Sequence, residues 1–312
     1  MDALTSRLST RFLVVTVVPN VLLLGYLGFL FAAGAPTRSP SMARALRLLD
    51  GLTLRQMLVL ILGTLVVSLA THPLQTPLVQ FVEGYWGGLP FGRMAAEIFT
   101  ERFRDELRWT QNEIKRAQAT ISSDSAMEQS FIEAQIRQYW LPPEEQYLLP
   151  TALGNTLWRG ERRAGGRYGL ELDFAMPRLM PLLSPPSLAE LRDRRNQLDA
   201  AVRLSMAAGF ATVAGIALLI WHGAWLILPV VTYLLCWAAY RSAVAAARGF
   251  SVSLAAAVDL HHLQLFEALH LEQPTNLEDE YDLNTTLSIM FRDGLPPEDR
   301  SELRYIFRKQ DE

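Results

Sequence analysis

Three histidines near the carboxyl end of the chain are the residues whose type is best suited to metal chemistry. His261, His262 and His270 lie in one predicted helical stretch, and histidines at helical spacing can converge on a metal ion. His262 and His270 are about two helical turns apart, and only Asp259 or Glu267 could complete a ligand set. We therefore interpret the stretch as an amphipathic helix, and we expect no metal site and no cofactor.

The motifs of covalent catalysis are also missing. The sequence has no nucleophile motif and no His-Glu-x-x-His. The glycine-rich segment 165–169 follows no strand, so it reads as a turn and not as a phosphate loop. We expect no catalytic residue and no enzyme, and we set aside a lipid-directed enzyme that would use His72 or Glu83. The single cysteine, Cys236, excludes intrachain disulfides, and the net charge of −3 gives no footprint for nucleic acid.

The remaining candidates are polar or helix-breaking residues inside apolar runs. Asn20 is the strongly polar side chain in the middle of the first run, where it can bond to another helix or line a pore. His72 lies beside Pro73, where an ionisable side chain either has a functional role at depth or sits at the interface. Pro19, Pro73 and Pro229 are candidate hinges, with passive kinks as the alternative.

Four apolar runs predict an all-α integral membrane protein with two transmembrane helical hairpins. The runs cover about 12–35, 55–86, 203–220 and 224–241, and about 20 apolar residues suffice for a helix to cross roughly 30 Å of hydrocarbon. A cleaved signal peptide is the competing reading of the first run, but that run is too long and a second follows. The turn at 221–223 is so short that the last two spans must be antiparallel neighbours.

The segments between and after the hairpins have the composition of soluble helices. We expect an N-terminal hairpin at 1–86, a cytoplasmic helical domain at 87–202, a second hairpin at 203–248 and a C-terminal helical segment at 249–312. Periodic apolar residues over 93–139, with a break at 122–125, predict a helical hairpin. Ser187 is a good N-cap for one continuous helix into the third run. Small residues there allow close helix packing, namely Ala208, Ala211, Thr212 and Gly215.

Arginines next to the spans predict the orientation. Four spans put both termini and the central domain on one side, and the positive-inside rule makes that side cytoplasmic, in a bacterial inner membrane. The triplet Arg192, Arg194 and Arg195 belongs to this signal and is also a candidate contact for lipid headgroups. Arginines in the first loop oppose this orientation, unless residues 42–52 lie on the membrane surface as an amphipathic helix.

Several short segments carry a resemblance to known sequences. They are residues 74–86, 149–155, 167–170, 176–179 and 256–260. Through them the chain resembles a group of uncharacterised multi-pass membrane proteins common in actinobacteria. Only two of the 29 basic residues are lysines, Lys115 and Lys309, which is typical of GC-rich genomes. The resemblance implies membrane topology and source, and it transfers no binding or catalytic residue.

Two functions from different classes fit these observations. The first is an oligomeric membrane channel or membrane-perturbing effector gated by the cytoplasmic domain, suggested by the continuous helix, the interrupted first span and a central segment too long to be a loop. The second is a membrane-anchored scaffold or adaptor that presents helical surfaces, favoured by the lack of charged residues within the spans. The expected partners are the lipid bilayer, other copies of the chain, and a cytoplasmic protein or small-molecule signal.

Overall fold

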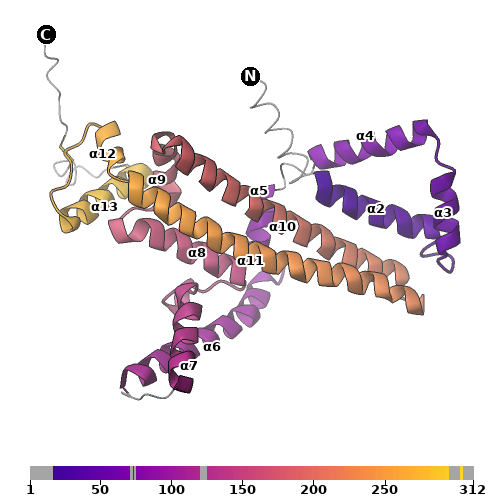
Figure 1. Ribbon diagram of the computed structural model, residues 1–312, viewed down its shortest axis with the longest axis horizontal. Coiled ribbons are helices and arrows are strands. Elements are labelled where there is room, and N and C mark those ends of the chain that lie inside the picture. Colours follow the sequence, from indigo (N-terminus) through magenta and orange to yellow (C-terminus); the bar gives the residue numbers. More distant parts are fainter. Residues whose placement is uncertain (1–16, 71–72, 74, 120–124, 295–302, 305–312) are drawn as a thin grey trace, which may run out of the picture. The chain divides into compact units, whose positions relative to one another are not determined.

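The computed structural model describes residues 17–70, 73, 75–119, 125–294 and 303–304. Within these residues the chain is all-helical and contains no strand, as the sequence predicts (Figure 1). The chain divides into two compact units. The first, called the apolar unit here, comprises residues 1–85 and 196–246, and the second, the helical unit, comprises 86–195 and 247–312.

Among the described residues of the apolar unit are four shorter helices and parts of two longer ones. The shorter helices are α2 (Val18–Ala33), α3 (Met42–Asp50), α4 (Leu54–Ala70) and α5 (Gln75–Glu83). Helix α10 (Pro185–Leu219) ends in this unit, and α11 (Ile227–His261) begins in it after the 3-10 turn η6 (Gly223–Leu226). The structure thus has two helices, α4 and α5, where we expected one bent helix over 55–86. Pro73 lies between them and lacks the N–H that a continuous helix would need.

Helices shorter than α10 and α11 form most of the described part of the helical unit. In chain order they are α6 (Gly92–Ala119), α7 (Ser125–Tyr139), η3 (Glu145–Tyr147), α8 (Ala152–Gly165), η4 (Gly166–Tyr168), α9 (Leu172–Leu179), η5 (Met180–Leu182), α12 (Gln264–Ala268) and α13 (Leu277–Asp293). The predicted hairpin over 93–139 is confirmed, because α6 packs against α7. The unit also contains the first turns of α10 and the last turns of α11.

Two described helices are long and apolar enough to cross a membrane. They are α10 and the continuous stretch Gly223–His261. A third candidate arises if α3 and α4, which meet at a bend of 105°, form one span. Helix α2 has 16 residues, so its described part is roughly 24 Å long, short of the roughly 30 Å of hydrocarbon. The described part of the chain therefore contains two or three candidate spans, and the predicted layout of two complete hairpins stays a prediction.

Helices α10 and α11 are antiparallel neighbours in the apolar unit. Thr212 donates a hydrogen bond to Thr232 over 2.9 Å, and Ser205 donates to the Cys236 carbonyl over 3.3 Å. The small residues of α10 that we expected to allow close helix packing are buried, as Ala208, Ala211 and Thr212 show. A Cβ at Gly215 would meet the hydroxyl of Tyr26 in α2 and lie 3.3 Å from Pro229 Cβ. Glycine is thus needed at position 215 because two neighbours approach the backbone.

Helix α10 begins earlier than the sequence suggests. We expected Ser187 as the N-cap, but the helix starts at Pro185. Ser184 acts as the capping side chain, because its Oγ accepts a hydrogen bond of 3.4 Å from the Ser187 N–H. Two prolines fit in the first turn of a helix, where the missing N–H groups would have no intrahelical partner. The prediction of one continuous helix into the third apolar run is confirmed.

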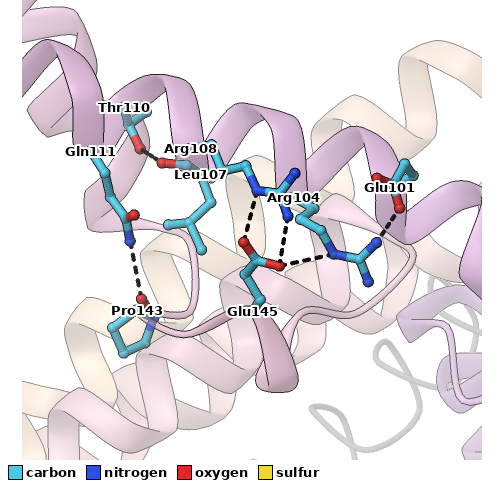
Figure 2. Close-up of polar contacts among 8 residues, drawn as sticks. All are labelled: Glu101, Arg104, Leu107, Arg108, Thr110, Gln111, Pro143 and Glu145. Carbon is cyan, nitrogen blue, oxygen red and sulfur yellow. Dashed lines mark hydrogen bonds and ion pairs between the residues drawn. The ribbon is translucent and has the colours of Figure 1, made fainter.

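Polar contacts and a small apolar cluster fasten the segment 141–148 onto α6 (Figure 2). Glu145 points between two arginines of α6, with Oε1 2.8 Å from Arg108 Nε and Oε2 3.1 Å from Arg104 Nε. Leu107, on the same helix, packs against Leu141 and Leu148. Gln111 donates to the Pro143 carbonyl over 3.4 Å. The segment is thereby fixed between the α6–α7 hairpin and α8.

We predict that the apolar cluster stabilises segment 141–148 more than the ion pairs do. Leu107 is 1% exposed, so Leu107→Ala should lower the free energy of opening of this segment by about 2–5 kcal/mol. Glu145→Gln should lower it by less than about 1 kcal/mol, because the pairs are solvent-exposed. Hydrogen exchange of residues 141–148 in the full-length protein measures both values. Equal effects of the two substitutions would contradict the prediction.

Candidate functional site

The candidates from the apolar runs lie at helix ends or in contacts between helices. The Asn20 side-chain amide donates a hydrogen bond to Ser68 Oγ over 3.2 Å, which links α2 to α4. Pro19 is in the first turn of the described helix α2, and Pro229 is in the first turn of α11. Pro73 is exposed between α4 and α5, and His72 lies outside the described residues. The hinge and pore-lining roles of these residues remain predictions.

The three arginines expected to contact lipid headgroups lie on α10 within the helical unit. Arg194 Nε donates to Glu190 Oε1 over 2.7 Å, one helical turn earlier. Arg195 lies over the ring of Phe250 at 5.5 Å from its centroid. Arg192 and Arg195 border a pocket with the side chains of Met176, Met180, Leu254 and others. These contacts do not test the headgroup role, which also stays a prediction.

Two of the three candidate histidines, His261 and His262, make side-chain contacts within the chain, for His270 only a backbone hydrogen bond to Glu267 is described, and the described residues contain no group of three potential metal ligands. His261 Nε2 accepts a hydrogen bond of 3.1 Å from the Ser184 N–H, so Nδ1 donates to the Ala257 carbonyl over 3.0 Å. His262 Nδ1 lies 2.9 Å from the Val258 carbonyl and Nε2 lies 2.8 Å from Glu280 Oε1. These two histidines join α11 to other elements of the helical unit.

A cavity of about 230 Å³ in the helical unit gathers arginine and aromatic side chains that the sequence analysis did not single out. We call it the arginine cavity. Helix α8 and the adjacent turn η4 contribute arginines, and α11 contributes one wall. Two aromatic residues, Tyr139 at the end of α7 and Trp140 directly after it, contribute another part of the lining. Its lining comprises Tyr139, Trp140, Arg159, Gly160, Arg163, Arg167, Ser251, Val252, Ala255, Ala256 and Asp259.

Two local features place α8 beside α11. The Thr151 hydroxyl caps α8 by accepting a hydrogen bond of 3.0 Å from the Gly154 N–H. Buried Asn155 bonds to both backbone groups of Leu149, accepting over 2.7 Å and donating over 2.9 Å. Further along α8, a Cβ at Gly160 would overlap the side chain of Ser251 in α11. Glycine at 160 therefore lets the two helices approach closely, and Arg159 and Arg163 on either side of it line the cavity.

Arg159 and Arg163 form the unbalanced positive part of the cavity. The buried Nε of Arg159 has no hydrogen-bond partner. Burial lowers the pKa of Arg159, and the neighbouring positive charge of Arg163 lowers that pKa further. The Arg163 guanidinium lies 3.4 Å from the centroid of the Tyr139 ring, a cation–π contact that leaves the charge unneutralised. No described carboxylate is in an ion pair with either arginine.

The third arginine of the cavity is paired. Arg167 lies 3.5 Å from an Asp259 carboxylate oxygen, and the same oxygen accepts a hydrogen bond of 3.0 Å from the Tyr168 hydroxyl. Burial raises the pKa of Tyr168 above its usual value of 10.0, and the hydrogen bond to Asp259 raises that pKa further. Asp259 thus anchors η4 to α11, and its charge is committed to Arg167 and Tyr168.

Helix α13 is connected to α11 beside Tyr168 by a buried contact. The Tyr168 ring stacks on His262, with centroids 4.0 Å apart. Since a carbonyl only accepts, His262 Nδ1 donates to the Val258 carbonyl, and Nε2 lies 2.8 Å from Glu280 Oε1. The Glu280 and His262 side chains are only 7% and 10% exposed. This buried pair connects α13 to the helix that carries Asp259.

Comparison with protein-family models, with curated proteins and with solved structures gave no match. The resemblance to actinobacterial membrane proteins therefore stays an expectation, and no site residue can be transferred from a relative. One signal in the sequence could have indicated the cavity. Arg159, Arg163 and Arg167 recur at intervals of four, which places them on one side of a helix.

We predict that Arg159 destabilises the protein when no anion is bound. Because folding lowers the pKa of Arg159, the charged form is disfavoured in the folded state at every pH below that pKa. Arg159→Met removes the charge and retains an unbranched side chain. It should raise the thermal midpoint of full-length protein in buffer without multivalent anions. Arg162→Met is the matched control, because exposed Arg162 is on the same helix and does not line the cavity. A midpoint that falls in Arg159→Met would be evidence against this electrostatic account.

We also predict an alkaline signature of Tyr168. Its folded-state pKa is raised, so its stabilising contribution is present below about pH 10 and is lost as the pH rises through the folded-state pKa. Tyr168→Phe should cost about 1–2 kcal/mol at pH 7 by removing a hydrogen bond to a carboxylate. The difference in stability between wild type and variant should shrink above pH 10. Thermal midpoints from pH 7 to 11 measure it, and a constant difference would exclude the assigned cause.

Proposed function

We propose that this protein is a membrane-anchored adaptor whose helical unit binds an anionic ligand in the arginine cavity, without transport or catalysis. The observation that carries the proposal is the Arg159–Arg163 pair. Two guanidinium groups border one cavity, neither is paired with a described carboxylate, and one has a buried Nε without a partner. Like charges held together and partly desolvated are unfavourable until an anion offsets them. Such a cavity fits the recognition of an anion.

The polar side chains of the apolar unit support anchoring. Asn20 bonds to Ser68, Thr212 bonds to Thr232, and Ser205 bonds to the backbone of α11. Hydrogen bonds of this kind hold helices together in a bilayer, where an unsatisfied polar group is costly. Apolar side chains of α4 are exposed around most of the helix, including Leu58, Val59, Leu60, Ile61 and Leu62. Contact with lipid or with another copy of the chain would cover them.

The channel hypothesis makes a different demand on the same residues. A conducting pore needs a water-filled path lined by polar groups, charged rings or backbone carbonyls. In the apolar unit the hydroxyl and amide groups named above are engaged between helices, so we rank the adaptor first. Gating by the helical unit, oligomer formation and the cytoplasmic location of this unit remain proposals.

Ion flux across liposomes separates the two functions. For an anchor we predict that vesicles containing purified full-length protein hold an imposed potassium gradient as long as protein-free vesicles do. Asn20→Leu should leave the vesicles sealed and should lower thermal stability by about 1 kcal/mol, the usual value of one hydrogen bond between membrane helices. Flux through the wild type that disappears in a correctly assembled Asn20→Leu variant would refute the anchor and favour a pore lined by Asn20.

A further inference from the structure

We infer that the arginine cavity binds a phosphate monoester. The inference rests on the proposed function and names the chemical class of its ligand. The shared chemistry is a terminal phosphate on a small organic group, which can come from a soluble phosphomonoester or from the headgroup of phosphatidic acid.

Charge is the first argument. The ionised side chains of the lining are three arginines and Asp259, so the cavity has a net charge of +2. Asp259 already contacts Arg167 and Tyr168, which leaves Arg159 and Arg163 as the two unpaired positive charges. A phosphate monoester carries about −1.5 to −2 charge near neutral pH and would balance both. A carboxylate or a phosphate diester carries a single negative charge and would leave about one positive charge unbalanced.

Geometry is the second argument. Arg159 and Arg163 are four residues apart on α8 and border the same cavity. Each guanidinium presents a planar fork of N–H donors, and a fork can take up two oxygen acceptors. One carboxylate has two oxygens and satisfies a single fork, whereas the terminal phosphate has three oxygens that can be shared between two forks. The Arg159 Nε has no hydrogen-bond partner within the described residues, so this N–H of the guanidinium is not committed to another group of the chain.

The apolar and aromatic walls of the cavity are suited to contact the organic group that carries the phosphate. Tyr139, Trp140, Val252, Ala255 and Ala256 line the same space as the arginines. Tyr139 and Val252 are 42% and 55% exposed, so the cavity is reached from the surface of the helical unit. Apolar and aromatic walls beside a few convergent polar groups are typical of sites for small organic ligands. A phosphate carried on a short carbon chain fits both parts of the lining.

Binding by detergent-solubilised full-length protein tests the inference. The probes are glycerol 3-phosphate and dioctanoyl phosphatidic acid, each titrated calorimetrically in buffer without phosphate. We expect saturable binding of at least one probe, and a loss of affinity of about tenfold or more in Arg159→Met and in Arg163→Met, because each removes a charge-assisted contact. Arg162→Met should bind as the wild type does. The thermal midpoint of each variant without ligand shows that it is folded.

The two sources of the phosphate give different results. Binding of phosphatidic acid at least tenfold tighter than of glycerol 3-phosphate would support a lipid headgroup, and similar affinities would support a soluble phosphomonoester. Dimethyl phosphate and dioctanoyl phosphatidylglycerol are the monoanionic controls. The inference is overturned if these diesters bind as tightly as the monoesters, if neither monoester binds, or if binding persists unchanged in Arg159→Met.

Failure of the inference differs from failure of the proposed function. If succinate binds in place of the monoesters and loses affinity in Arg159→Met, the ligand is another dianion and the phosphate assignment falls, while the adaptor function stands. If liposomes leak ions, the adaptor function falls whether or not glycerol 3-phosphate binds.

Discussion

The close approach of α8 to α11 at Gly160 is the constraint on which the candidate site depends. Any larger residue would overlap Ser251 and separate the two helices. With glycine there, Arg159 just before it on α8, Arg163 one turn later and Arg167 in η4 all line the cavity beside α11. The separation of helix axes is normally set by the side chains at the contact. The absence of a Cβ at Gly160 therefore allows α8 and α11 to line the same cavity.

Desolvation links the stability of the helical unit to its proposed ligand. Most buried polar groups in a folded protein have partners, and a partly buried charge without one reduces stability. The helical unit satisfies Asp259, His261 and His262 within the chain, but it leaves Arg159 and Arg163 without counter-charges. A site that costs stability when empty is a common consequence of selection for binding. Within one cavity, Arg167 has a carboxylate partner and Arg159 has none among the described residues. This difference is the reason for proposing that the cavity binds an anion.

In the apolar unit, polar side chains serve mainly to connect helices. Its helices carry few polar side chains, and those described in detail bond to one another across α2 and α4 or α10 and α11. Small residues on α10 let Tyr26 and Pro229 approach the backbone. Packing and paired hydroxyls hold such helices together where the hydrophobic effect cannot drive helix–helix association. The proposed division between an anchoring unit and a binding unit rests on this difference in composition.

The sequence by itself determined the features that depend on local pattern and length. The all-helical fold, the α6–α7 hairpin, the tight turn before α11 and the unbroken α10 follow from apolar periodicity, run length and the positions of glycine and proline. The tertiary structure decided the start of α10 at Pro185, because Ser184 and Ser187 compete as caps and proline is tolerated in a first turn. The spacing of the arginines is visible in the sequence, but the tertiary structure alone decided what they face, since Tyr139 comes from α7 and Ser251 from α11. Contacts of that kind follow from packing geometry, which leaves no periodic signal in the sequence.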